Sequence, residues 1–202
     1  VNTVSEYFGG DGADGDLVVS TGGYTNAAKT YVTGNNASGQ NTLNVNDTSF
    51  FSLGDEILII TMRDSMNVLN VGLNQTVEIS TINSNSFTLS ENLNYSFNTD
   101  NGKIHQVLKI LKYNNFTIES GASLSTGGWG GNVGGVIYLK VSDTLTINGH
   151  ITANGSGYGL GAENSQVSGA SGYQGEGRAG LGIQSSSANG IGGSGGAYTY
   201  PG

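Results

Sequence analysis

Glycine is the residue that most limits what this chain can fold into. The sequence has 202 residues and 35 glycines, and 24 of those glycines follow residue 120. Glycine is a poor residue for the interior of a helix, because it loses more backbone freedom on folding than any other residue. The second half of the chain is therefore expected to form turns, extended backbone and closely packed strands rather than helices.

Short strands are predicted through most of the first half. Between residues 42 and 110, apolar runs and alternating apolar and polar residues recur with turn residues every 8–12 positions. That spacing is typical of a small barrel or sandwich and not of alternating strands and helices. Only residues 64–69 could form a helical turn. The predicted strands cover residues 16–20, 41–47, 54–62, 76–82, 86–90, 103–111 and 116–120.

One short pattern occurs twice after residue 113. Two apolar positions, a glycine turn and another apolar position recur about 29 residues later. Successive turns of a β-solenoid look like this, because each turn buries alternate side chains and bends at small residues. The matched positions are Phe116 with Leu145, Ile118 with Ile147, and Leu124 with Ile151.

The glycine-rich end of the chain allows two interpretations. Residues 156–202 have the composition of a flexible linker, but tyrosines, leucines and isoleucines interrupt it. Gly169, Gly172 and Gly175 are spaced by three, which in a polyproline-II helix places glycine along one edge and lets neighbouring chains approach closely. The apolar residues favour ordered backbone packing over a flexible coil.

These patterns predict an all-β chain with four segments. N-terminal strands and an Asp/Gly turn occupy residues 1–40, and a small β-barrel or sandwich occupies residues 41–112. β-solenoid-like rungs follow in residues 113–155, and a polyproline-II-like, glycine-rich tail occupies residues 156–202.

The charges of the chain exclude several partners. Seven basic residues stand against 15 acidic ones, giving a formal net charge of −8. No cluster of lysine or arginine could neutralise a run of phosphates, so nucleic acid is not an expected partner. No apolar run reaches 18 residues, so no membrane span is predicted. The chain has no cysteine, which excludes disulfides and thiolate metal sites.

Three aspartates form the one candidate metal site. Asp11, Asp14 and Asp16 fall within six residues, among glycines that permit a sharp bend. Carboxylates so close together repel one another unless a hard cation or solvent intervenes, and Ca²⁺ prefers such oxygen ligands. The alternative is an ordinary solvated turn, since Asp and Gly are common in turns. No other cofactor is expected.

A candidate carbohydrate contact lies around the single tryptophan. Trp129 is flanked by glycines, and Tyr158 lies nearby in the same glycine-rich half. An exposed indole can stack on a sugar ring, whereas an indole packed against glycine backbone can instead cap the end of a solenoid. The sequence leaves both readings open.

No catalytic residue is predicted. His105 alternates with the apolar residues of its strand, which places it on a surface or interface, and His150 lies at a turn. Glu176 and Arg178 are the only charged pair in the glycine-rich tract and suit a local ion pair better than an acid/base pair. The sequence therefore favours a role that is not enzymatic.

The order of these segments resembles glycine-rich secreted or surface proteins of bacteria. The resemblance rests on GGDGADGDLVVS, GDEILIITM, TVEISTINSNSFTLSENL, GGVIYLKVSDTLTINGHITANGSG, GYQGEG and SSSANGIGGSGG. In such proteins, a segment like residues 41–110 is similar to the small barrel at the front of β-helical surface and tail-fibre proteins. The resemblance implies an extracellular or cell-surface location and a β-rich structural region.

Two functions follow as hypotheses. The first is an extracellular structural or adhesive module that associates with copies of itself into a fibre or surface layer, because low charge leaves strand edges unguarded against strand addition. The second is a β-helix that binds or cleaves surface glycans and uses Trp129 with nearby tyrosines.

Overall fold

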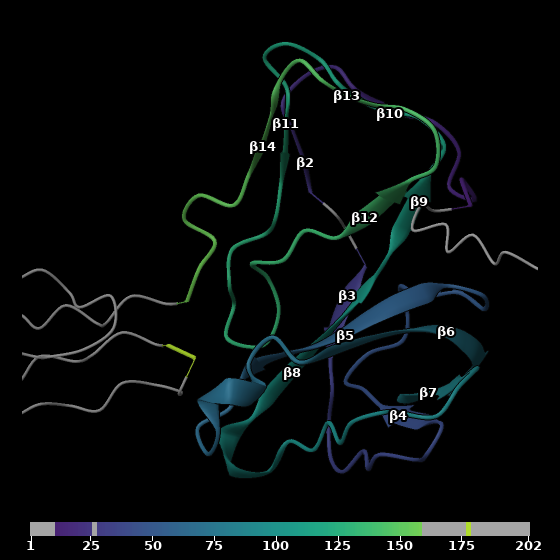
Figure 1. Ribbon diagram of the computed structural model, residues 1–202, viewed down its shortest axis with the longest axis vertical. Coiled ribbons are helices and arrows are strands. Elements are labelled where there is room, and N and C mark those ends of the chain that lie inside the picture. The colour runs from purple at the N-terminus through teal and green to yellow at the C-terminus, as the bar shows by residue number, and fades with distance from the viewer. Residues whose placement is uncertain (1–10, 26–27, 159–176, 179–202) are drawn as a thin grey trace, which may run out of the picture.

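The described part of the protein is built from β-strands and two single 3-10 turns (Figure 1). The computed structural model describes residues 11–25, 28–158 and 177–178. Gly169, Gly172 and Gly175 lie outside the described residues. The strands and turns are β1 Leu17–Val19, β2 Gly23–Thr25, β3 Lys29–Tyr31, β4 Thr42–Asn44, β5 Glu56–Arg63, η1 Val68–Asn70, β6 Asn74–Ile82, β7 Ser86–Leu89, η2 Asp100–Gly102, β8 Ile104–Lys109, β9 Leu111–Tyr113, β10 Phe116–Ile118, β11 Ser123–Ser125, β12 Leu139–Val141, β13 Leu145–Ile147 and β14 His150–Thr152.

A six-stranded antiparallel sheet forms the lower part of the molecule in Figure 1. Its strand order is β3-β8-β5-β6-β7-β4. The sheet curls so that its edge strands β3 and β4 approach each other at one end, where an isolated bridge joins Val32 to Val45 and Thr33 N donates to Asn44 O at 2.9 Å. Of the predicted barrel or sandwich, the structure therefore forms a curled half-barrel sheet.

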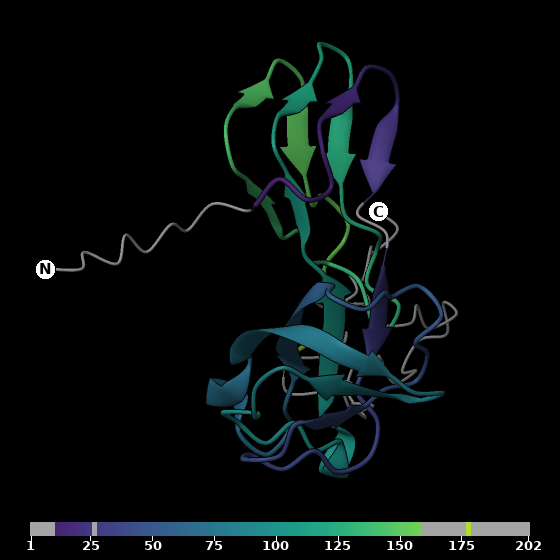
Figure 2. The ribbon, with the colours of Figure 1, turned by 90° about the vertical axis from the view of Figure 1, so that its right-hand side faces the viewer.

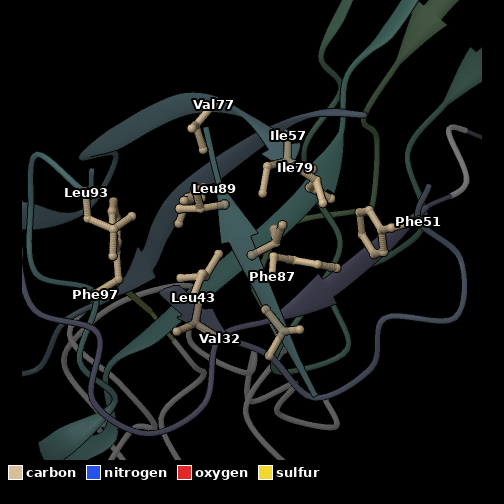
Figure 3. Close-up of a cluster of buried hydrophobic side chains, with 13 residues drawn as sticks. Val32, Leu43, Phe51, Ile57, Val77, Ile79, Phe87, Leu89, Leu93 and Phe97 are labelled. Carbon is tan, nitrogen blue, oxygen red and sulfur yellow. The ribbon is translucent and has the colours of Figure 1, made fainter. Parts of the chain in front are cut away.

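Alternate residues of these strands point into the curl and make its core. On β6, Val77 and Ile79 are buried while the residues between them are exposed, as one buried face requires. Figure 3 shows the side chains converging from several strands, with Phe51 meeting Phe87 edge to face at 5.1 Å between ring centroids. The core residues are Val32, Leu43, Val45, Phe51, Ile57, Ile59, Val77, Ile79, Phe87, Leu89, Leu93, Phe97 and Val107.

Short parallel strands stack beside the curled sheet, and Figure 2 shows them standing side by side above it. One stack has the order β1-β10-β13, a second has the order β14-β11-β2, and β9 pairs with β12. Phe116 pairs with Leu145, and Leu124 pairs with Ile151. The alignment of these positions in the sequence is therefore confirmed as strand pairing.

The curled sheet interrupts this stack in sequence. Leu17 of β1 pairs with Phe116 of β10, although the two lie 99 positions apart in the sequence. Residues 29–109 carry the strands of the curled sheet and lie between these two stacked neighbours along the chain. Strands from the first predicted segment thus pair with strands from the third.

Burial changes from layer to layer along the stack. In the middle layer Ile118 and Leu124 are fully buried. In the last layer their partners Ile147 and Ile151 are 47% and 44% exposed. Among the described residues, no strand covers the free side of β13 and β14. The last layer therefore presents aliphatic side chains and an open strand edge.

The sequence predicts His105 on a surface or an interface, and a position on the solvent-exposed surface is wrong. His105 is 3% exposed, because both faces of β8 are covered. Val107, two residues on, joins the core inside the curl, and Leu108 packs in a second cluster with Val136 and Tyr138 against it. The predicted helical turn at 64–69 appears as the 3-10 turn η1 at Val68–Asn70.

In the described part of the chain, no helix has the length and apolar character needed to cross a membrane.

Candidate functional site

Trp129 and Tyr158, the two candidate carbohydrate contacts, lie together in the structure. Their rings meet edge to face, with 5.6 Å between centroids and 80° between planes. Both side chains are half-buried. Trp129 follows β11 and Tyr158 follows β14, and β11 and β14 are paired neighbours. The stacking of the two strands therefore brings the two aromatic residues to the same place.

Glycine packing fixes the loop that carries Trp129. Gly135 N donates to Gly127 O at 3.0 Å, and Gly130 N donates to Val133 O at 2.9 Å, so the two arms of the loop are bonded to each other. Gly134 has a φ of +122°, and a Cβ at this position would overlap the carbonyl of Gly128. The loop thus needs a residue without a side chain at Gly134. Close backbone packing holds the indole in a defined position.

A pocket of about 140 Å³ lies beside the two rings. Its lining residues are Met62, Trp129, Gly135, Ser156, Gly157 and Tyr158. Most of this lining is apolar side chain and glycine backbone. Aromatic faces beside an apolar hollow can pack against the C–H face of a sugar ring, while polar edges bond its hydroxyl groups.

Backbone groups at the end of β5 form hydrogen bonds with Tyr158 and Arg178. The hydroxyl of Tyr158 donates to the carbonyl oxygen of Met62. Two residues further on, Asp64 N donates to Arg178 O at 3.0 Å. Residues 158 and 178 are therefore both fastened to one short stretch of backbone next to the pocket.

Asp64 stabilises this end of β5. The carboxylate is 2% exposed and accepts hydrogen bonds from Met66 N, Asn67 N and Asn70 Nδ2, each at 2.9 Å. Burial raises the pKa of Asp64, but the hydrogen bonds from Asn70, Asn67 and Met66 outweigh it, so the pKa lies below its ordinary value. The carboxylate acts as a structural acceptor that shapes the turn.

Two of the three predicted calcium ligands bond to Lys112, and the third bonds to Asn115. Asp11 Oδ2 lies 3.0 Å from Lys112 Nζ, and Asp14 Oδ2 accepts from Lys112 N at 2.7 Å. Asp16 Oδ1 accepts from Asn115 N at 3.0 Å and from the Asn115 side chain at 3.1 Å. Over the residues that the structure describes, no group of three or more acidic or histidine side chains is arranged to hold a metal ion. A calcium site there stays a prediction.

Lysines supply the positive charge at this turn. The hydrogen bond to Lys112 holds the pKa of Asp11 below its usual range. Lys112 Nζ also lies 3.8 Å from Glu56, whose carboxylate is 2.8 Å from Lys140 Nζ. Burial lowers the pKa of Lys112, but the hydrogen bond to Asp11 and the negative charges of Asp11, Glu56 and Glu78 together outweigh it, so the pKa is raised. These ion pairs tie the stacked strands to the curled sheet.

His105 is held as a neutral ring in the core. Its Nε2 is 2.9 Å from Asn98 O, which can only accept, so Nε2 carries the proton and donates. Nδ1 then accepts from the Thr61 hydroxyl at 3.0 Å. Burial lowers the pKa of His105. His150 is exposed on β14. The two histidines therefore lie in different environments, His105 buried and His150 exposed.

Among the residues of this site, sequence reasoning missed Met62, Ser156 and the glycine arms around Trp129. The glycine arms did have a signal, which is the run of glycines on both sides of Trp129 in GGWGGNVGG. Glycine at so many positions of one short loop indicates backbone packed against backbone. Met62 had no signal, because its place in the pocket depends on a contact between segments about 96 residues apart.

Comparisons with known proteins give structural neighbours only. No protein-family model matches the chain, and no curated protein matches its sequence. Three solved structures with some likeness are phage tailspikes. Tailspike gp49 of Pseudomonas phage LKA1 is 11% identical over 55% of this chain and 24% of its own, with a TM-score of 0.33. Gp54 of Acinetobacter baumannii bacteriophage AP22, solved with A. baumannii capsular saccharide, is 11% identical over 75% of this chain and 32% of its own, with a TM-score of 0.36. Tailspike gp61 of Pseudomonas phage phi297 is 8% identical over 74% of this chain and 26% of its own, with a TM-score of 0.36. The chain spans about a quarter to a third of the length of these tailspikes.

Proposed function

We propose that this chain is an extracellular carbohydrate-binding module built on a short β-solenoid. Three stacked layers support the solenoid: β1 and β2 in the first, β9 to β11 in the second, and β12 to β14 in the third. In this proposal the curled sheet, residues 29–109, is an insertion between the first and second turns, and β9, at the end of the predicted module 41–112, belongs to the second turn.

The pairing of Trp129 with Tyr158 carries the binding proposal. Two aromatic rings from neighbouring layers converge beside a pocket, and bonded glycine arms hold one of them in position. An aromatic surface that is fixed before the ligand arrives loses little conformational freedom on binding. Saccharides are the ligand class that combines apolar ring faces with hydroxyl edges, and such faces pack against aromatic rings.

A binding screen on immobilised oligosaccharides tests this proposal. We expect the purified protein to bind a subset of the sugars and Trp129→Ala to lose that binding. Tyr95→Ala is the matched control, because Tyr95 carries a 42% exposed aromatic ring, lies between β7 and η2, and does not line the pocket. Equal binding by the parent and Trp129→Ala, or no binding to any sugar, would contradict the proposal.

The open end of the stack favours a second function, self-association into a fibre or surface layer. Leu145, Ile147 and Ile151 are 45%, 47% and 44% exposed, and they align with buried partners in the next layer. Strands from another copy could add to this edge through backbone hydrogen bonds and apolar burial. Such an assembly would persist in 1 M NaCl, because salt screens charge pairs but not apolar contacts.

Size-exclusion chromatography distinguishes this second function. Ile147→Lys places a charge among the aliphatic side chains, whereas Thr146→Lys changes the neighbouring residue of the same strand. Self-association predicts large species for the parent and for Thr146→Lys, and a monomer for Ile147→Lys. A parent that is monomeric at high concentration would rule the second function out.

A further inference from the structure

Among the residues that the structure describes, no charged side chain lines the pocket beside Trp129. Among the described residues that form it, Met62, Trp129 and Tyr158 contribute side chains, and Gly135, Ser156 and Gly157 complete the wall. None of these side chains is ionised at neutral pH. A carboxylate or an ammonium group entering the pocket would lose its hydration without gaining a charged partner, which costs free energy.

The charge of the whole chain points the same way. The formal net charge is −8, so an acidic polysaccharide meets long-range repulsion as it approaches. A cationic sugar would be attracted at a distance but would find no carboxylate among the side chains that line the pocket. Both arguments favour an electrically neutral ligand.

The size of the pocket limits what enters it. Its volume is about 140 Å³, well below the roughly 300–1,000 Å³ of pockets that enclose a whole small molecule. The pocket can therefore take one substituent of a sugar while the ring itself lies against the aromatic rim. A hydroxyl group would leave the apolar part of this space unfilled, since the thioether of Met62 and the two aromatic rings offer mostly apolar contact.

We propose that the pocket binds the acetamido group of a neutral N-acetylated sugar; this rests on the proposed function. The methyl of the acetamido group contacts Met62 and the aromatic rings, where burial of an apolar group is favourable. Its amide offers one donor and one acceptor to the backbone of Gly157, whereas the N–H of Gly135 is already bonded to Gly127 O. The group is uncharged, as the lining and the net charge require.

Two oligosaccharides that differ only at this substituent provide the test. Chitohexaose, here always the fully N-acetylated form, shares its linkage and ring geometry with cellohexaose. Chitohexaose carries an acetamido group where cellohexaose carries a hydroxyl. By isothermal titration calorimetry, we expect chitohexaose to bind about tenfold more tightly, from one buried methyl and one amide hydrogen bond.

A substitution that fills the pocket locates the effect. A Cβ at Gly157 would meet nothing within 4 Å, so Gly157→Val places methyl groups in open space at the pocket. We expect this variant to lose the preference for chitohexaose. Gly177→Val is the matched control, because a Cβ there also meets nothing within 4 Å and Gly177 does not line the pocket.

The outcomes separate this inference from the proposed function. Equal affinity for the two hexaoses, or stronger binding of hexagalacturonate, would overturn the inference and leave saccharide binding intact. If Trp129→Ala loses sugar binding while Gly157→Val still prefers chitohexaose over cellohexaose, the inference is also overturned. If no sugar binds, the proposed function fails as well.

Discussion

Ile118 and Ile147 are directly paired in neighbouring parallel strands, yet only Ile118 is sealed from water. Ile118 is fully buried, whereas Ile147 is 47% exposed. The difference comes from position in the stack, because among the described strands Ile118 has a layer on both sides and Ile147 on one side only. An isoleucine side chain therefore contributes differently to the free energy of unfolding in the two layers.

Alanine substitutions at these two positions should differ in cost. Ile118→Ala leaves a cavity between two layers and should lower the free energy of unfolding by about 2–5 kcal/mol. Ile147→Ala should cost less than about 1 kcal/mol, because much of that side chain already contacts water. Urea denaturation measures both values. Similar losses for the two variants would show that Ile147 is covered in solution.

His105 should make stability depend on pH. Burial lowers its pKa in the folded protein below the ordinary 6.5, so below that pH the unfolded chain binds a proton that the folded chain does not. The free energy of unfolding should therefore fall as pH falls through 6.5. The loss is about 1.4 kcal/mol for each pH unit that separates the two pKa values, until the folded ring itself is protonated.

His105→Gln provides the control for this effect. The amide cannot be protonated in this range, so the difference in unfolding free energy between pH 7.5 and pH 5 should be smaller in the variant than in the parent. The same pH dependence in both proteins would assign the effect to other groups.

Calcium should have little effect on the thermal stability of the parent protein. Asp11 and Asp14 bond to Lys112, and Asp16 bonds to Asn115, so their oxygens already have partners. Addition of millimolar CaCl₂ or of a chelator should leave the melting temperature unchanged. A ligand that binds only the folded state would raise it. A melting temperature that rises with Ca²⁺ would establish the aspartate turn as a metal site.

Of the glycines around Trp129, Gly134 should not tolerate substitution by alanine, whereas Gly128 should. Gly134→Ala places a Cβ against the carbonyl of Gly128 at a φ of +122°, so the loop must rearrange. A Cβ at Gly128 itself meets nothing within 4 Å, so Gly128→Ala should be accepted. Near-ultraviolet circular dichroism reports the surroundings of the indole. Identical spectra for both variants would show that the glycine packing does not position Trp129.

The strand pattern could be predicted from the sequence because it is local. Alternating apolar residues identified most strands of the curled sheet, and the match of Phe116 with Leu145 predicted a pairing across only 29 residues. The pairing of Leu17 with Phe116 was not predicted, since the curled sheet separates them. Its signal was the spacing in Leu17-x-Val19, which repeats that of Phe116-x-Ile118.

The candidate site was predictable only in part, for the same reason. Trp129 and Tyr158 were named from their residue types, but their contact depends on the stacking of β11 on β14. The lysine partners of Asp11 and Asp14 lie about 98–101 residues away and gave no signal near the aspartates. The burial of His105 depends on segments that cover both faces of β8, which the alternation within one strand does not reveal.

The fluorescence of Trp129 tests the proposed binding site most directly, because the chain has one tryptophan. Titration of the parent protein with chitohexaose should give a saturable change in emission, as the sugar excludes water from the indole. Gly177→Val should give the same curve, and Gly157→Val should bind more weakly. Emission that stays constant, while a neutral oligosaccharide binds by calorimetry, would place the binding surface elsewhere and contradict the assignment to Trp129 and Tyr158.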